Sequence, residues 1–294
     1  MLKASSPAVK WIIYTVLCLI WGSSFILMKH GLVVYTPGQV AAIRMSVAFL
    51  CLLPFVIRHL KEIPKEKWKY VIAAGVLGNG IPSILFTTAE TKLSSSVAGV
   101  LNALTPVFTL IVGLMFFKFK TTATRSFGVI LGFSGAVLMT IYNAEGKYEG
   151  NYLYGFLIIL ACIAYAFDTF ILNNYLMTLN PVYVAGCALF LVGPFAITYL
   201  FTTDFTTRLA HDNGAVFSFF CAAALGAFGT AMAQALFNHM LKISSLLFSA
   251  SVTYVIPVVA IVWGIFDNEK LGWIQVIGFV AVITSVFLIN TRKT

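Results

Sequence analysis

Residues 94–113 read SSSVAGVLNALTPVFTLIVG, a stretch without a charged residue. A helix of ~20 such residues matches the ~30 Å hydrocarbon thickness of a bilayer, so we expect it to cross a membrane. The same arrangement of an early serine pair and a later proline returns in SSLLFSASVTYVIPVVAIVWG, residues 244–264. Pro106 and Pro257 each remove a backbone donor, which predicts that both helices kink toward a central cavity.

Apolar stretches of similar length fill most of the chain. The 294 residues are 60% hydrophobic and 10% charged, and their mean hydropathy is +0.94. This leaves too few polar residues to cover a soluble domain of that size. We therefore expect an all-α integral membrane protein with about ten transmembrane helices. The expected spans are 11–29, 38–57, 68–88, 94–117, 124–142, 152–174, 181–201, 215–239, 244–266 and 271–290. The first is too long for a cleaved signal peptide and is expected to stay as an anchor.

The net charge of +9 is spread over many connecting segments. If the N-terminus is cytoplasmic, 13 of the 19 Lys and Arg residues fall on inner segments and 5 on outer ones. The positive-inside rule then predicts a multi-pass protein of the cytoplasmic membrane with both termini inside. This distribution does not form the basic face or tail that would indicate a nucleic-acid partner.

Cysteine and histidine give no sign of a cofactor. The five cysteines fall within the expected spans, where small free thiols usually pack against other helices. The four histidines are too scattered to predict a metal site. No G-x-x-x-x-G-K-[ST] loop for a nucleotide is present in the sequence.

An internal repeat relates the two halves of the chain. Trp21 and Pro37 recur 144 residues later as Tyr165 and Pro181. A further set recurs at a separation of 151 residues: Gly78, Ser94, Pro106 and Gly113 match Gly229, Ser245, Pro257 and Gly264. Residues 11–142 and 152–290 thus form two units with an odd number of spans each, so the second unit should enter the membrane from the opposite face. Inverted units build a site between them with two nearly equivalent open states, as alternating access requires.

Several motifs resemble those of a known family. They are WGSSF followed by Lys29, AAIR ending at Arg44, the two serine-to-proline stretches, FGVILGFSGAVLM at 127–139 and VIGFVAVITSVFLI at 276–289. Over nearly its whole length the chain resembles the EamA-type permeases of the drug/metabolite transporter superfamily. That family often carries a Gly-Glu pair after the fourth and ninth spans. Here Lys118 replaces the first acid and Asn268 the glycine before Glu269, a departure expected to affect only a loop.

The resemblance implies secondary transport of small metabolites, commonly export. It also implies a cavity lined mainly by the first, third, fourth, sixth, eighth and ninth spans. Because members carry very different substrates, it does not identify one.

Two charged residues lie deep within expected spans, away from the span ends. Arg44 either snorkels or pairs structurally, or holds a carboxylate or phosphate through its planar guanidinium. Asp168 is the only acid within a span, and apolar surroundings penalise its charged form, so it is a candidate for proton coupling. The alternative is an acid that is hydrogen-bonded near the cytoplasmic mouth. Span boundaries place the two residues ~15 Å apart along the membrane normal, which predicts that they serve different halves of the pathway.

Other polar and aromatic residues are candidates for the cavity wall. The full predicted set is Trp21, Arg44, Asn79, Asn102, Tyr165, Gln234 and Tyr254. Amides at such positions can instead bridge helices, and aromatic rings can pack or face lipid.

Residues near span ends and one glycine face have simpler interpretations. Glu90 and Lys92 flank an outer hinge and are expected to be exposed, while Lys29 and His30 should snorkel or face water. Gly128, Gly132 and Gly135 form a small-residue face, used either within the monomer or between two copies.

These features favour a transporter of amino acids or small amphipathic compounds. A membrane-embedded enzyme would need converging catalytic or metal-binding groups, and a channel would need a filter motif or rings of like charge. An organic-phosphate antiporter is the alternative among transporters, although Arg44 is the one clear intramembrane cation. The expected partners are a small-molecule substrate and the lipid bilayer, with the protein acting as a monomer or homodimer.

Overall fold

The computed structural model describes residues 7–116, 122–142, 144–148, 151–244, 249 and 252–290. Within these ranges the secondary structure is helical, apart from one isolated antiparallel bridge between Tyr142 and Tyr148. The first half consists of α1 (Pro7–Gly31), α2 (Pro37–His59), η1 (Leu60–Glu62), η2 (Lys65–Lys67), α3 (Trp68–Gly75), η3 (Val76–Gly80), α4 (Ile81–Ala89), α5 (Ser95–Asn102), α6 (Thr105–Phe116) and α7 (Ala123–Ile141). The second half consists of α8 (Tyr152–Ile171), η4 (Leu172–Leu176), α9 (Pro181–Thr202), α10 (Phe205–His211), α11 (Ala215–Ala224), η5 (Leu225–Met232), α12 (Ala233–Ile243), α14 (Val252–Phe266) and α15 (Trp273–Asn290).

Eight helical stretches in the described part of the chain are long and apolar enough to cross a bilayer. They are Ala8–Gly31, Pro37–Glu62, Lys65–Ala89, Ser95–Phe116, Ala123–Ile141, Tyr152–Leu176, Pro181–Thr202 and Ala215–Ile243. Two shorter apolar helices, Val255–Phe266 and Trp273–Ile289, fall where the ninth and tenth spans are expected. The all-helical membrane architecture therefore agrees with the sequence analysis, while the count of about ten spans stays a prediction.

Two helices at corresponding places in the halves begin in the same way. Thr36 precedes Pro37 at the start of α2, and its side chain accepts a hydrogen bond from the Gln39 amide. Asn180 precedes Pro181 at the start of α9, and its side chain accepts one from the Val182 amide. A side-chain cap followed by proline suits a helix start, because the missing N–H there would have had no partner.

Three spans are interrupted near their middle. Residues Val76–Gly80 and Leu225–Met232 form π-helical turns within the third and eighth spans. The fourth span breaks at residues 103–104, so that α6 begins just before Pro106. By contrast, α14 runs through Pro257 as one helix. Such interruptions change the direction of nearby backbone groups and often lie at functional sites.

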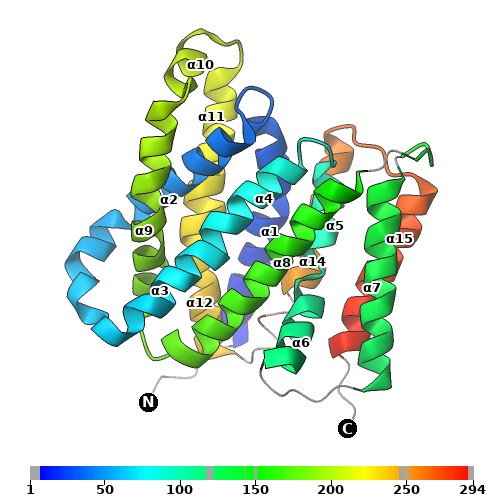
Figure 1. Ribbon diagram of the computed structural model, residues 1–294, viewed down its shortest axis with the longest axis horizontal. Helices are drawn as coiled ribbons and strands as arrows, with labels where there is room; N and C mark the ends of the chain where they lie inside the picture. Colours follow the sequence, from blue (N-terminus) through cyan, green and yellow to red (C-terminus); the bar gives the residue numbers. More distant parts are fainter. Residues whose placement is uncertain are drawn as a thin grey trace.

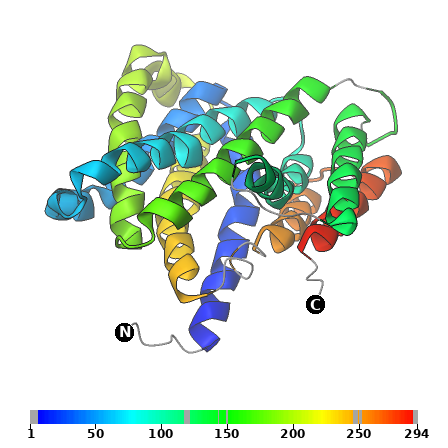
Figure 2. The ribbon, with the colours of Figure 1, turned by 60° about the horizontal axis from the view of Figure 1, so that its bottom comes forward.

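Helices of the two halves alternate in the bundle. Helix α2 lies along α9, α7 along α15 and α4 along α8, while α1 contacts α11 and α12. Figure 1 shows that α1 begins and α15 ends at the same end of the molecule, which we call the terminus end. At the opposite end lie the α1–α2, α4–α5 and α14–α15 connections. Figure 2 shows the same bundle with the terminus end turned toward the viewer.

Close backbone approaches also occur in matched pairs. A Cβ atom on Gly75 would lie 2.5 Å from the carbonyl oxygen of Ala188, and one on Gly226 would lie 2.5 Å from that of Arg44. Both distances are shorter than real Cβ contacts, so only glycine fits at either crossing. Gly75 and Gly226 are 151 residues apart, and Arg44 and Ala188 are 144 apart, the separations found in the repeat.

The glycine face of α7 is occupied within the chain. Gly128, Gly132 and Gly135 all face α15, and a Cβ atom on Gly135 would lie 2.6 Å from the Gly278 carbonyl oxygen. Small residues allow such close contact between membrane helices. This face is therefore covered by α15 and does not face a second copy.

Candidate functional site

A cavity of about 310 Å³ lies among helices of both halves of the chain. Its wall includes residues of α1, α2, η3, α4, α5, α6, α8, η5, α12 and α14. Arg125 in the first turn of α7 and Ile289 in the last turn of α15 also line it. Because both lie near the terminus end (Figure 1), the cavity extends toward that end of the bundle.

Most of the residues that the sequence marked out meet at this cavity. Its lining includes Trp21, Arg44, Asn79, Asn102, Tyr165 and Gln234, together with Asp168 and Pro106. Pro257 is not part of the lining. Lys118, Ser245 and the side chain of Tyr254 lie outside the described residues. That these residues bind a substrate stays a prediction.

Aromatic rings form one wall of the cavity. Trp21 Nε1 donates a hydrogen bond to the Gly229 carbonyl oxygen at 3.1 Å, which ties α1 to the π-helical turn η5. The Trp21 and Phe237 ring centroids are 5.2 Å apart. Phe86 lies between Phe25 and Tyr165, with centroid distances of 5.9 and 6.1 Å. These rings offer a broad apolar surface to a ligand.

Arg44 is held inside the bundle and does not snorkel. It is 9% exposed, and its Nε donates a hydrogen bond to Thr230 Oγ1 at 2.7 Å. The Tyr165 hydroxyl lies close to the guanidinium. Within the described ranges no carboxylate pairs with Arg44. Its planar group is therefore positioned at the cavity without a protein anion.

Asp168 reaches the same cavity from α8. It is 6% exposed, and its Oδ1 has no hydrogen-bond partner in the described part of the structure. A Cβ atom on Gly78 would lie 2.5 Å from Asp168 Oδ2, so the glycine in η3 makes room for the carboxylate. At the matched position, a Cβ atom on Gly229 would lie 2.9 Å from Ser24 Oγ. Arg44 and Asp168 thus line one cavity, whereas boundary arithmetic had assigned them to different halves of the pathway.

Arg125 is a cavity residue that the sequence analysis missed. In the sequence it lies at the start of the expected span 124–142, where it contributes only to the excess of basic residues on the inner side. In the structure it lines the cavity, and its buried Nε has no hydrogen-bond partner among the described residues. Arg125 lies three residues before Gly128 and seven before Gly132, so it shares the α7 face that meets α15. This spacing could have predicted that its side chain points into the bundle.

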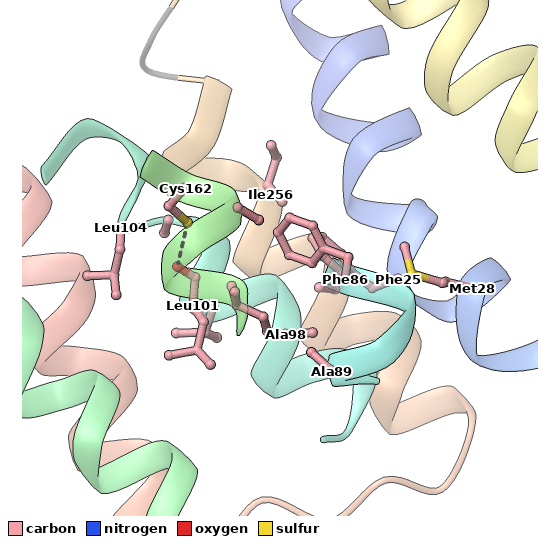
Figure 3. Packing of buried hydrophobic residues seen from close by; sticks show 14 of the residues in the cluster. Phe25, Met28, Phe86, Ala89, Ala98, Leu101, Leu104, Cys162 and Ile256 are labelled. Atoms are coloured by element: carbon pink, nitrogen blue, oxygen red, sulfur yellow. Dashed lines mark hydrogen bonds between the residues drawn. The ribbon is translucent and has the colours of Figure 1, made fainter. Parts of the chain in front are cut away.

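The cavity is closed at the end opposite the terminus end by an apolar layer. Phe25, Met28 and Phe86 line it there and are 5%, 2% and 3% exposed. Figure 3 shows Phe25 and Met28 from α1 next to Phe86 from α4, with Ile256 from α14 beside them. Cys162 and Leu101 continue this packing, with the Cys162 thiol donating to the Leu101 carbonyl oxygen at 3.7 Å.

An ionic cluster lies directly beyond the apolar layer. Lys29 Nζ is 2.6 Å from Asp267 Oδ2 and 2.9 Å from Glu269 Oε1. His30 Nε2 is 3.3 Å from Asp267 Oδ1. Lys29 and His30 keep partly exposed side chains, as expected, but they also pair with these carboxylates, because the α14–α15 connection brings two of them to the end of α1.

Glu269 joins this cluster to the start of α5. Its Oε1 accepts hydrogen bonds from the amide and hydroxyl of Ser95, at 3.0 and 2.8 Å. Its Oε2 accepts from the amide and hydroxyl of Ser96, at 3.0 and 2.6 Å. Although burial acts in the other direction, the hydrogen bonds from Lys29, Ser96 and Ser95 lower the pKa of Glu269 to about 2. Asn268 before it has φ of 60°, a backbone region that favours glycine.

Glu90 is buried, which contradicts the expected exposure. It follows α4 directly and is 7% exposed. Neither of its carboxylate oxygens has a hydrogen-bond partner among the described residues. Burial, with a smaller contribution from the charge of Glu269, raises the pKa of Glu90 well above its usual value, while Arg44 and Lys29 act in the opposite direction. Lys92 is exposed, as expected.

The family model and the relatives that match this chain all describe transporters. The model of the EamA-like transporter family matches residues 9–141 and 153–291. A protein from Archaeoglobus fulgidus named "Uncharacterized transporter" is 26% identical over 290 residues, covering 97% of this chain and 99% of the relative. The "Uncharacterized inner membrane transporter YedA" of Escherichia coli K12 is 26% identical over 282 residues, covering 94% of this chain and 89% of the relative.

A solved crystal structure shares the fold. It matches with a TM-score of 0.63 and covers 96% of both chains. The sequences are 14% identical, so this match bears on the fold alone.

Proposed function

Because the chain belongs to the EamA-like transporter family, we propose that it is a secondary transporter that exports small zwitterionic metabolites, amino acids among them, by alternating access. The family and the relatives named as transporters indicate a membrane transporter rather than an enzyme. The substrate class, the direction and the access mechanism are our proposal.

The observation that carries the substrate class is the placement of Arg44 and Asp168 on one cavity without an ion pair between them. A zwitterion satisfies both, with its carboxylate on the guanidinium and its ammonium on the Asp168 carboxylate. The aromatic wall would take an apolar side chain. A volume of about 310 Å³ is at the small end of ligand cavities, which suits a metabolite of that size.

An organic phosphate is the weaker alternative. Arg44 and Arg125 would both attract a phosphate. The Asp168 carboxylate on the same cavity would repel a dianion, or would have to be protonated to admit it. A zwitterion has no such conflict.

The alternating-access part of the proposal rests on an inverted two-fold relation between the units 11–142 and 152–290. The paired approaches of Gly75 to Ala188 and Gly226 to Arg44 support this relation. The contacts of Gly78 with Asp168 and Gly229 with Ser24 follow the same separations. If the terminus end is cytoplasmic, as the basic residues predict, the described state is open toward the inside and closed outside. Such a state would load substrate from the cytoplasm.

The test is a ligand series that varies one charge at a time. Purified protein would be screened by thermal shift against amino acids, the matching methyl esters and the matching decarboxylated amines. Any ligand found would then be followed by flux in proteoliposomes. We expect the parent amino acids to stabilise the protein and to be transported, and the esters and amines to bind roughly 10- to 100-fold more weakly.

A matched pair of arginine variants completes this test. Arg44→Gln should reproduce the loss of carboxylate affinity, whereas Arg58→Gln in the last turn of α2 should behave as wild type. Equal binding of the acid, ester and amine, or full affinity in Arg44→Gln, would contradict a zwitterion site.

A further inference from the structure

Glu90 is a carboxyl that the proposed transport site does not use. It lies beyond the apolar layer of Phe25, Met28 and Phe86, outside the lining of the cavity. Both of its oxygens are buried and lack a hydrogen-bond partner in the described part of the chain. An ionised carboxylate in that position would bear a large desolvation cost without compensation, so the closed arrangement favours the neutral acid.

The surrounding charges do not supply the missing partner. Lys29 is already held by Asp267 and Glu269, so these three groups carry one net negative charge before Glu90 is counted. Glu269 itself is fully hydrogen-bonded at the start of α5 and stays ionised. A second net negative charge at Glu90 would be repelled by this cluster.

The groups that face Glu90 come from each neighbouring element. Lys29 belongs to α1 and Glu269 to the α14–α15 connection, and both act on Glu90 through their charge. Lys92 follows Glu90 along the chain. From α2, the charge of Arg44 also acts on Glu90. Arg44 is engaged by Thr230, and Lys92 is exposed. The free acid is therefore the state of Glu90 that fits this arrangement.

We propose that Glu90 is a proton-binding site that controls the outer gate, taking up a proton from the outer solution when the gate closes and releasing it there when the gate opens. This inference rests on the alternating access of the proposed function. It is separate from any role of Asp168, because Glu90 lies beyond the layer that closes the cavity. Glu90, Lys29 and Glu269 also border a depression in the molecular surface, through which protons can reach the site.

The direction of the pH effect follows from the buried acid. The closed state binds the proton more tightly than the open state, so acid outside favours closure and a higher pH favours opening. For a single proton, the ratio of open to closed molecules changes at most about tenfold per pH unit.

The experiment measures opening directly and needs no substrate. In a cysteine-free background, Met28→Cys places a thiol at a position that is 2% exposed beneath the gate. A membrane-impermeant thiol reagent is added to the outside of oriented proteoliposomes at a series of pH values. Rates are normalised to Thr91→Cys, which is exposed in the adjacent connection and corrects for ionisation of the thiol. We expect the normalised rate to rise with pH, by up to about tenfold per unit.

Two substitutions assign the effect to Glu90. With Glu90→Gln, which mimics the neutral acid, the normalised rate should be low and independent of pH. Glu90→Asp keeps a titratable group and should restore the dependence, which also excludes a folding defect at this position. Glu66→Gln removes an exposed acid at the terminus end and should leave the dependence unchanged.

The proposal is overturned if Glu90→Gln retains the pH dependence, if wild type shows none, or if Met28→Cys never reacts from outside. These results are distinct from failure of the proposed function, which would appear as a lack of carboxylate preference in the ligand series.

Discussion

The most direct test of the ionic cluster is Glu269→Gln. The substitution keeps the size of the side chain and removes its charge. Glu269 is 5% exposed at its side chain and accepts hydrogen bonds from Lys29, Ser95 and Ser96. In the variant, the side-chain nitrogen would face groups that are themselves donors. Buried donors without acceptors cost free energy in addition to the lost ion pair.

The magnitude follows from the ionisation of Glu269. Its pKa falls from the ordinary 4.5 to about 2 in the folded protein. That difference corresponds to at most about 3 kcal/mol of stability above pH 4.5. For a chain of this size, a loss of about 2 to 3 kcal/mol should lower the Tm by roughly 4 to 10 °C.

The pH dependence gives the prediction a second readout. A carboxylate whose pKa is lower in the folded protein stabilises it above the unfolded pKa, and the contribution is lost as the pH falls toward the folded pKa. The Tm difference between wild type and Glu269→Gln should thus be full at neutral pH and at pH 4.5 or just above, and shrink toward about pH 3.

The assay is thermal unfolding of purified protein in one detergent at each pH. Glu145→Gln is the matched control, because its side chain is 69% exposed and its ion pair with Lys147 lies at the surface. It should change the Tm little. An equal Tm for wild type and Glu269→Gln at neutral pH, or a difference that does not depend on pH, would refute the role assigned to this carboxylate.

Three further predictions concern the backbone contacts, the orientation and the coupling. Gly75→Ala should destabilise the protein by about 1 to 3 kcal/mol in thermal unfolding, because the added Cβ atom meets a backbone oxygen of α9. Gly80→Ala is the control: its Cβ atom would meet nothing nearer than 3.7 Å, so stability should change by less than about 1 kcal/mol. Equal effects of the two substitutions would contradict the close crossing. A single cysteine at exposed Lys61 should be labelled only from the cytoplasm and one at exposed Asp212 only from outside, and the reverse result would invert the proposed orientation. Asp168→Asn should abolish proton-driven flux in proteoliposomes and should also weaken amino-acid exchange between equal pools, because the substrate ammonium loses its proposed partner. Wild-type flux across the physiological pH range would exclude coupling at this residue.

The cavity residues could be predicted because polar groups within a membrane span avoid the lipid and turn toward the protein interior. Trp21, Arg44, Asn102 and Asp168 lie at depths where polar atoms facing lipid are costly. They therefore turn toward the inside of the bundle, and the structure finds them on one cavity. The internal repeat matched Trp21 with Tyr165, and both residues line this cavity.

The groups at the end opposite the termini were not predictable from local sequence. Lys29 and Glu90 lie where helices end, and a charged residue there usually faces water. Their actual surroundings depend on the α14–α15 connection, which brings Glu269 to α1 and α5 over more than 170 residues of chain. The substitution at Asn268 was expected to affect only a loop. That loop carries the carboxylate that caps α5, and Asn268 adopts the positive φ for which glycine is suited.

Arg125 shows a different limit. Counting it among the inner basic residues used its charge as a signal of orientation, and that use said nothing about where its side chain points. Its helical face, shared with Gly128 and Gly132, carried the missing information, because that face packs on α15 beside the cavity.

Three acids with buried side chains, Glu269, Asp168 and Glu90, divide into two kinds, and the division bears on how such a protein would cycle. Glu269 has every oxygen satisfied and stays ionised, so it can hold the start of α5 in place without taking part in titration. Asp168 and Glu90 are equally buried, but each has at least one oxygen without a hydrogen-bond partner among the described residues. A buried and unpartnered carboxyl lowers the stability of the state that contains it, unless a proton, a ligand or a change of conformation compensates. Two such groups, one on each side of the layer formed by Phe25, Met28 and Phe86, are what a transporter needs if its inner site and its outer gate respond to protons separately.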